Sequence, residues 1–181
     1  MKNVEDCVSK RDWKPPAKAE TPLTAICRPE LDVSHESNST DSSHCQSLIG
    51  ILRWMVELGR VDMCPEVSVM SSHLALPREG HLQQPLHVFA HLKKYHNAEM
   101  VFDPSHPHID ENEFPDKDWS TSEFGSELKE ILPGNMPEPR GQGMIMRCFV
   151  DADHASDSIT RRSRTGFVIY LNTAPIYWFS K

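Results

Sequence analysis

The clearest pattern along the chain is a run of apolar positions that recur every three or four residues after residue 41. Asp41 or Ser42 can cap the start of a helix there, because a short polar side chain accepts a hydrogen bond from a free N–H of the first turn. Gly59 suits the left-handed residue that commonly ends a helix. The apolar positions between these limits are Leu48, Ile49, Leu52, Met55 and Val56. This spacing predicts an amphipathic helix.

Two further helices are predicted before residue 100. One covers about residues 64–76, where Pro65 is acceptable in a first turn and Pro77 stops the helix. The other covers about residues 80–97, with one apolar face and a basic last turn. Four large side chains fall at helical spacing and are expected in the core of this unit: Trp54, Met55, Leu58 and Phe89.

The last third of the chain has the pattern of strands. Residues 144–150, 165–171 and 174–180 are each rich in residues that favour extended backbone. Asn172 and Thr173 separate the last two segments, and this spacing suits a tight hairpin. The predicted class is therefore α+β, with a small helical unit followed by a three-stranded antiparallel meander.

Irregular segments flank these units. Residues 1–44 carry several prolines and end in a Ser-rich polar tract, so they are expected to form a disordered or extended lead-in. Residues 103–145 are acidic and interrupted by prolines, and they are expected to form a loop-rich connector. This connector separates a helical region, residues 45–102, from the strands of residues 146–181.

Composition affects two expectations, the extent of ordered structure and the binding of nucleic acid. The hydrophobic content is 38% and there are 14 prolines, whereas ordinary domains are roughly 45–50% apolar with Gly included. We therefore expect ordered islands joined by irregular chain. The formal net charge is −7, which gives no general attraction to nucleic acid, because such binding depends on Lys and Arg replacing counterions at phosphates. Any nucleic-acid contact must then be local.

The cysteines and the N-terminus restrict the compartment. The 5 cysteines are scattered and form no Cys-x-x-Cys pair, which argues against a disulfide framework and a zinc finger. The first residues are polar and do not have the apolar core of a signal peptide. No apolar stretch approaches the roughly 18–20 residues of a membrane-spanning helix. We expect an intracellular protein, cytoplasmic or nuclear, that is not secreted and has no membrane partner.

The candidate chemistry lies near the C-terminal strands. An apolar strand brings Asp151 to the point where the pattern turns polar. Metal-dependent cleavage of phosphodiesters needs several carboxylates, which hold two Mg²⁺ ions roughly 3.5–4 Å apart. Arg161, Arg162 and Arg164 follow, and their guanidinium groups suit phosphate geometry. A charged turn between two strands also accounts for these arginines without any ligand.

Histidines offer weaker candidates. His87 and His91 lie four residues apart, a spacing that lets two imidazoles of one helix reach a metal. No third ligand is placed by the sequence, so a zinc site is not expected. His106, His108 and Asp110 are interpreted as part of a surface loop.

Two segments resemble parts of one known polyprotein, in the right order. Residues 47–50 read Ser-Leu-Ile-Gly, residues 60–63 read Arg-Val-Asp-Met, and residues 92–95 read Leu-Lys-Lys-Tyr. These are similar to the C-terminal end of the reverse transcriptase of copia-type long-terminal-repeat retrotransposons, where Arg-Pro-Asp-Ile stands in place of Arg-Val-Asp-Met. Residues 151–155, Asp-Ala-Asp-His-Ala, and residues 161–167, Arg-Arg-Ser-Arg-Thr-Gly-Phe, resemble the beginning of the ribonuclease H domain of the same polyproteins.

The resemblance implies a role for Asp151. It corresponds to the first catalytic, metal-binding carboxylate of a ribonuclease H that uses Mg²⁺ and acts on an RNA/DNA hybrid. The resemblance implies no such role for Asp153 or Asp157. It also implies a thumb-like helical unit followed by truncated ribonuclease H-like strands.

The resemblance further implies that both catalytic centres are incomplete. Polymerisation in this family needs a Tyr-x-Asp-Asp turn, and the chain contains no Asp-Asp pair. The other nuclease residues of the family would lie beyond Lys181, so Asp151 is expected to be vestigial, with no tightly bound Mg²⁺. We expect a transposable-element fragment that is inactive alone, with the remainder of the polyprotein as a partner. Three alternatives stay open: a non-catalytic protein-interaction module, a decayed gene product without activity, and an enzyme completed by another chain.

Overall fold

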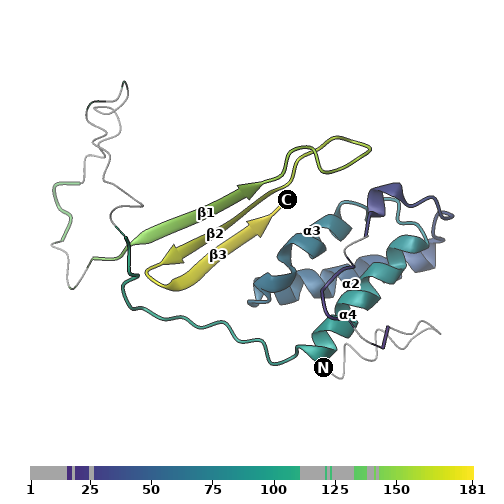
Figure 1. Ribbon diagram of the computed structural model, residues 1–181, viewed down its shortest axis with the longest axis horizontal. Coiled ribbons are helices and arrows are strands. Elements are labelled where there is room, and N and C mark those ends of the chain that lie inside the picture. Colours follow the sequence, from purple (N-terminus) through teal and green to yellow (C-terminus); the bar gives the residue numbers. More distant parts are fainter. Residues whose placement is uncertain are drawn as a thin grey trace.

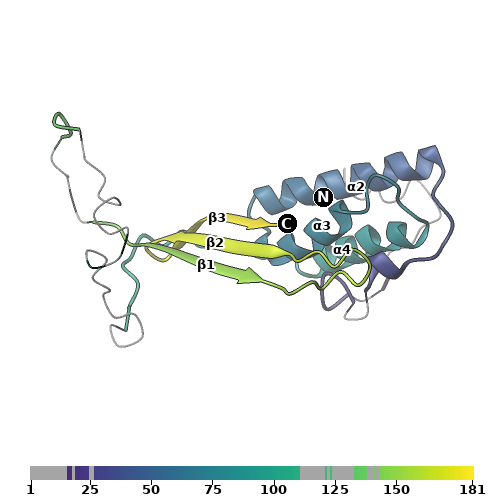
Figure 2. The same cartoon turned by 90° about the horizontal axis from the view of Figure 1, so that it is seen from above.

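The computed structural model describes residues 16–17, 19–24, 27–110, 121, 123, 133–137, 141 and 143–181. Within them, three α-helices form one unit and a three-stranded antiparallel sheet extends away from it, as Figure 1 and Figure 2 show from two directions. The expected α+β class is therefore confirmed.

Three α-helices and three short 3-10 helices make up the helical unit. The α-helices are α2 (Ser39–Glu57), α3 (Cys64–Ser71) and α4 (Gln83–Lys94). The 3-10 helices are η1 (Pro29–Leu31), η2 (Val61–Met63) and η3 (Gly80–Leu82). The order along the chain follows the sequence prediction, but several boundaries differ.

Helix α2 begins earlier than expected. Asn38 is its N-cap, and its side-chain carbonyl accepts a hydrogen bond from the N–H of Asp41 at 2.9 Å. Asp41, one of the two residues expected at the cap, therefore lies in the first turn, where its negative charge favours the helix N-terminus. The predicted end is confirmed, since Gly59 follows the last turn with φ of 116°, a conformation that favours glycine.

Helices α3 and α4 are shorter than predicted. After Ser71 the backbone tightens into turns: His73 N–H donates to Met70 O at 3.1 Å, three residues back. This spacing is the 3-10 pattern that often ends a helix. At the other end of the unit, η3 occupies the first residues of the third predicted helix, and α4 ends at Lys94 with Tyr95 N–H bonded to His91 O.

The hydrophobic core lies in the helical unit. Leu48, Leu52, Leu82 and Val88 are fully buried there. The other members of the cluster are Cys45, Ile49, Val56, Met63, Val67, Met70, Leu86, Phe89 and Leu92.

Two of the four large side chains predicted for the core point to solvent. Phe89 is buried and Met55 packs partly against the core, as expected. The prediction was wrong for Trp54 and Leu58, which are 64% and 69% exposed. Trp54 lies in the last turn of α2 and Leu58 is the C-cap of that helix, four residues later, outside the stripe that α3 and α4 cover.

Part of the segment expected as a lead-in packs on the helices. Pro29 and Ala19 are buried. Glu36 and Arg78 form an isolated antiparallel bridge, flanked by a hydrogen bond from Ser37 N–H to Pro77 O at 3.0 Å. The described residues of this stretch, 19–24 and 27–38, include the short helix η1 and lie against the helical unit.

The sheet consists of β1 (Met146–Ala152), β2 (Thr165–Leu171) and β3 (Ala174–Ser180), in the order β1-β2-β3. The bounds of β2 and β3 are as predicted. β1 starts and ends two residues later than predicted, because Asp151 pairs with Gly166 and Ala152 with Thr165. Asp151 therefore lies inside the strand.

Asn172 organises the hairpin between β2 and β3. It adopts φ of 55°, a left-handed conformation that Asn tolerates. Its side chain is buried, accepts a hydrogen bond from Ile145 N–H at 2.9 Å and donates to Pro104 O at 2.8 Å. The first residues of the expected connector thus dock on the hairpin. Much of that connector, residues 111–120 and 124–132 among it, lies outside the described residues.

Leu52 of α2 and Leu58, the C-cap of that helix, provide a test of this core. Leu52→Ala removes a fully buried side chain, so the free energy of unfolding should fall by about 2–5 kcal/mol. Leu58→Ala, at the exposed C-cap of the same helix, should change it by no more than about 0.5 kcal/mol. Urea denaturation followed by circular dichroism measures both. Equal losses in the two variants would contradict this assignment of the core.

Candidate functional site

Asp151 lies near the end of β1 and is exposed to solvent. Side chains alternate along a strand, so it shares a face with Phe149 and Arg147. Its directly paired residue on β2 is Gly166, which has no side chain to shield the carboxylate. The resemblance to ribonuclease H pointed to this residue, and the structure places it on an accessible surface.

Asp153 fixes the start of the loop that joins β1 to β2. Its carboxylate accepts hydrogen bonds from the Ser156 hydroxyl and from Arg164 N–H, the latter at 2.8 Å. These bonds hold the pKa of Asp153 below its usual value, and the Ser156 hydroxyl is the larger cause.

Asp157 plays the corresponding part in the middle of the loop. One of its carboxylate oxygens accepts the N–H groups of Ile159 and Thr160, at 2.9 and 2.7 Å. The loop also holds two residues with positive φ, Ala155 at 54° and Arg161 at 56°. The carboxylates of Asp153 and Asp157 therefore accept hydrogen bonds that shape the loop.

The three arginines of the loop have different surroundings. Arg161 and Arg162 are exposed, whereas Arg164 is half-buried. The Arg164 guanidinium lies 3.4 Å from the hydroxyl of Ser72, at the end of α3, to which it donates. In the part of the chain that the structure describes, no ion pair joins any of the three to Asp151. Among the described residues, the four predicted site residues thus form no ion pair with one another.

The donor set around Asp151 does not fit a two-metal centre. Among the described residues, no group of three or more His, Cys, Asp or Glu side chains could hold one metal ion. The nearest acids along the chain, Asp153 and Asp157, direct their oxygens at loop N–H groups. A hard divalent cation needs about six oxygen ligands, so Asp151 would supply only one of them.

His87 and His91, the pair weighed as metal ligands in the sequence, have different neighbours. His87 Nε2 lies 3.1 Å from Thr21 O. His91 packs instead against the ring of Tyr95, and its Nε2 is 3.8 Å from Asp62. The two rings therefore have separate partners.

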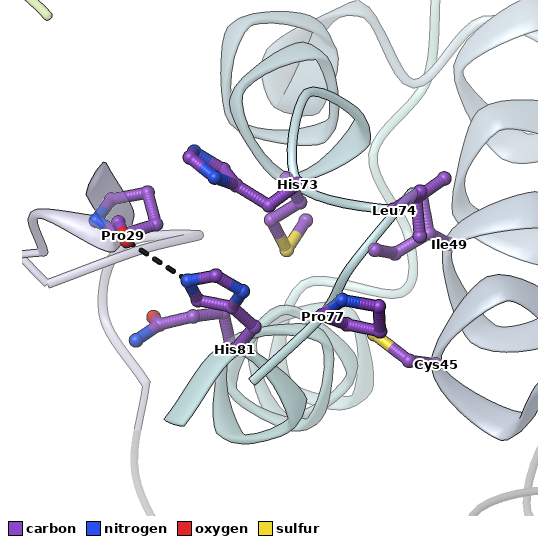
Figure 3. A pocket seen from close by; sticks show the side chains of 9 residues that line it. Pro29, Cys45, Ile49, His73, Leu74, Pro77 and His81 are labelled. Carbon is purple, nitrogen blue, oxygen red and sulfur yellow. Dashed lines mark hydrogen bonds between the residues drawn. The ribbon is translucent and has the colours of Figure 1, made fainter. Parts of the chain in front are cut away.

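A small pocket between the helices contains two other histidines, His73 and His81 (Figure 3). His81 Nδ1 accepts a hydrogen bond from Arg78 N–H at 3.1 Å, so its Nε2 carries the proton and donates to Pro29 O at 2.9 Å. The free volume is about 10 Å³, the least that a water molecule needs. This pocket is a packing feature that ties η1 to η3, and it has no room for a substrate.

A larger groove lies between α2, α3 and β3. It has a volume of about 480 Å³ and is open to solvent along its length. Trp178 of β3 lines it and donates its indole N–H to Val56 O at 3.0 Å. Its charged residues, Arg53, Glu57 and Lys181, are of mixed sign, so the groove shows no preference for a charged ligand.

An ionic cluster beside α4 was missed by the sequence interpretation. Arg60 binds Asp62 through two nitrogens, at 2.9 and 2.8 Å, and this bond holds the pKa of Asp62 below its usual value. Glu66 lies nearby, and one of its oxygens is buried without a hydrogen-bond partner among the described residues. Burial is the main cause that raises the pKa of Glu66.

The sequence carries signals for only part of what was missed. Asp153 followed by Ser156, and Asp157 followed by Thr160, have the Asp-x-x-Ser/Thr spacing of side-chain-capped turns. His91 lies at least 29 residues after Arg60 and Asp62 in the sequence. Only the folded chain brings His91 to this pair, so no local pattern predicts the contact.

The described helices do not include one that is both long enough and apolar enough to cross a membrane. Comparison of the chain with protein-family models, with curated proteins and with solved structures finds no match.

The raised pKa of Glu66 predicts how stability depends on pH. Its ordinary pKa is 4.5 and the folded value is higher, so the favourable contribution of the neutral form is complete below 4.5 and is lost as pH rises through the folded value. Glu66→Gln removes the buried charge at neutral pH. We expect the variant to melt at a higher temperature than the parent chain at pH 7, and the gap to close as pH falls below 4.5.

Thermal melts between pH 4 and pH 8 measure this effect. Glu57→Gln is the control, since Glu57 is exposed on α2, and it should give no such pH-dependent gap. A melting temperature of Glu66→Gln at or below that of the parent chain at pH 7 would contradict the interpretation.

Proposed function

We propose that the chain is a fragment of a copia-type retrotransposon polyprotein that spans the junction between reverse transcriptase and ribonuclease H. In the intact parent these are an RNA-directed DNA polymerase and a nuclease for RNA–DNA hybrids. The proposal assigns residues 45–102 to the end of the polymerase, as a thumb-like unit, and residues 146–181 to the first strands of a ribonuclease H-like fold. The observation that carries it is the meander β1-β2-β3, with an exposed carboxylate, Asp151, near the end of its first strand.

The fragment by itself is proposed to be catalytically inactive. Hydrolysis of a phosphodiester requires charge stabilisation on both the attacking and the leaving oxygen, and Asp151 alone supplies one ligand. In the parent, this carboxylate would help to hold Mg²⁺, which polarises the phosphate and activates water. The remaining ligands would come from outside the described residues.

The arginines of the β1–β2 loop are proposed as contacts to the nucleic-acid backbone. Arg161 and Arg162 are exposed and can present guanidinium groups to phosphates. Arg164 is the weakest of the three candidates, because its guanidinium already contacts Ser72 of the helical unit. The net charge of −7 makes such contact local to this loop.

A second candidate is a non-catalytic protein-interaction module. The observation that favours it is the exposure of Trp54, in the last turn of α2, and of Leu58, the C-cap of that helix. Large apolar side chains that gather on a surface often mark contact sites. In this reading the helical unit binds a protein and Asp151 has no present role.

A cleavage assay tests the inactivity of the fragment. The chain, incubated with Mg²⁺ and a labelled RNA/DNA hybrid, should release no more fragments than a blank without protein, and Asp151→Asn should behave identically. The physical reason is that a single carboxylate cannot position the metal ions. Cleavage by the parent chain that disappears in Asp151→Asn would show that the site is complete.

The sequence of the DNA and transcript on both sides of this reading frame tests the assignment itself. We expect a Tyr-x-Asp-Asp codon series upstream and the missing nuclease carboxylates downstream. If both are in frame, the chain is part of an active element. If stop codons or frameshifts interrupt them, the chain is a relic, and the interaction module becomes the better account of any present role. Flanks unrelated to a polymerase and a nuclease would refute the proposal.

A further inference from the structure

Among the residues that the structure describes, β1 forms a free edge of the sheet. The order is β1-β2-β3, and β3 is the strand that lies beside α3, so β1 is the edge away from the helices (Figure 1). Just beyond the two ends of β1, Ile145 O accepts a hydrogen bond from Asn172 N–H, and Asp153 N–H donates to Arg164 O. Backbone groups of a strand alternate in direction, so the odd-numbered positions between them face β2.

The even-numbered residues therefore present their N–H and C=O groups at the open edge. These residues are Met146, Cys148, Val150 and Ala152. All four are exposed. Such a row of unpaired backbone groups is a template for another strand.

Two of the devices that block strand edges, a proline and a β-bulge, are absent from β1, although it carries two charged residues, Arg147 and Asp151. It contains no proline, and its register with β2 is regular from Met146 to Ala152. The outer strand on the other side, β3, has both devices, Pro175 and a register shift opposite Ile169 and Tyr170. β1 is thus the edge that is open to pairing.

The charges on β1 are arranged symmetrically about its centre. Arg147 lies two residues before Phe149 and Asp151 lies two residues after it. If two copies of β1 pair antiparallel with a two-fold axis at Phe149, each Arg147 lies directly opposite Asp151 of the second copy. Any shift by two residues in either direction separates these charges.

The backbone geometry agrees with this register. Because the even-numbered residues face the open edge, Cys148 pairs with Val150 of the second copy as a hydrogen-bonded pair. The odd-numbered residues then form the non-hydrogen-bonded pairs, in which opposite side chains approach most closely. Arg147 and Asp151 fall in such a pair, on the same face.

Both charged groups have unused bonding capacity. Arg147 Nη2 donates to Asn172 O at 2.9 Å, but its Nε is buried without a partner among the described residues. The guanidinium is also held near the rings of Phe149 and Tyr170, with its central carbon 5.8 and 5.6 Å from their centroids. Asp151 is exposed on the same face. Pairing would place a carboxylate opposite Arg147, whose guanidinium would turn from Tyr170 and Asn172 toward the open edge to meet it.

We propose that the chain forms a symmetric homodimer through β1, with Arg147 of each copy paired to Asp151 of the other. The product is a continuous six-stranded antiparallel sheet. Its outer edges are the two β3 strands, which are blocked by Pro175 and the register shift, so the assembly closes at two copies and does not extend into a fibre.

A charge-exchange experiment on the full chain tests the dimer. Arg147→Asp places like charges opposite each other twice in the dimer, and so does Asp151→Arg. Each change should raise the dimer dissociation constant about tenfold or more. The double variant restores opposite charges in the exchanged order and should recover most of the affinity. Sedimentation velocity over a range of concentrations measures all four chains, with circular dichroism as a check on folding.

Asp151→Arg keeps the test valid if Arg147→Asp disturbs the hairpin, because only Arg147 also donates to Asn172 O. A parent chain that stays monomeric up to the highest soluble concentration would overturn the proposal. So would a dimer that resists both single changes, or a folded double variant that fails to recover association.

A cross-link tests the register independently. In the proposed pair, Cys148 lies opposite position 150 of the second copy, at a Cα separation of about 5.5 Å, which suits a disulfide. Mild oxidation of Val150→Cys should give a dimer in which mass spectrometry finds a 148–150 linkage. Tyr177→Cys is the matched control, exposed on the same face but in β3, and it should give no linkage between 148 and 177 of different copies. A 148–150 linkage that fails to form would exclude this register.

Discussion

The relative placement of sheet and helices depends chiefly on the indole of Trp178. Its N–H donates to Val56 O, and its ring packs against the core of the helical unit. All residues of that core cluster come from α2, α3, α4 and the 3-10 helices between them. Among the described residues of β1, β2 and β3, none is a fully buried apolar side chain. The sheet therefore owes its cohesion to backbone hydrogen bonds and to the hairpin at Asn172.

Because of this imbalance, the sheet leaves apolar side chains exposed to solvent. A three-stranded sheet needs a packed face for independent stability, yet Val150 and Tyr177 are 66% and 51% exposed. Phe167 stacks on Phe179 with ring centroids 5.3 Å apart, so some apolar surface is shared within the sheet. Burial of the remaining apolar surface requires another segment or another chain to pack against the sheet. A parent polyprotein and a second copy of the chain are two ways of supplying one.

Local signals in the sequence were enough for several elements. Gly59 predicted the end of α2, and the pair Asn172 and Thr173 predicted the turn that fixes the bounds of β2 and β3, because both depend on backbone conformation within a few residues. The burial of individual side chains and the neighbours of the candidate site depend on tertiary packing. Periodicity predicted that Trp54 lies on a helix. The width of the stripe of α2 that is buried depends on where α3 and α4 pack against it. In the same way the neighbours of Asp151 follow from chain pairing, which no local pattern records.

Asp151 has two proposed roles, and they exclude each other in space. A working nuclease centre needs other carboxylates within a few ångströms of this side chain, so the elements that carry them must pack close to the exposed side of β1. The second copy in the homodimer would occupy the same edge, because a strand edge pairs with one partner at a time. If the chain is the proposed fragment, self-association through β1 is a property of the chain by itself. In an intact parent, the segments that complete the site would displace it.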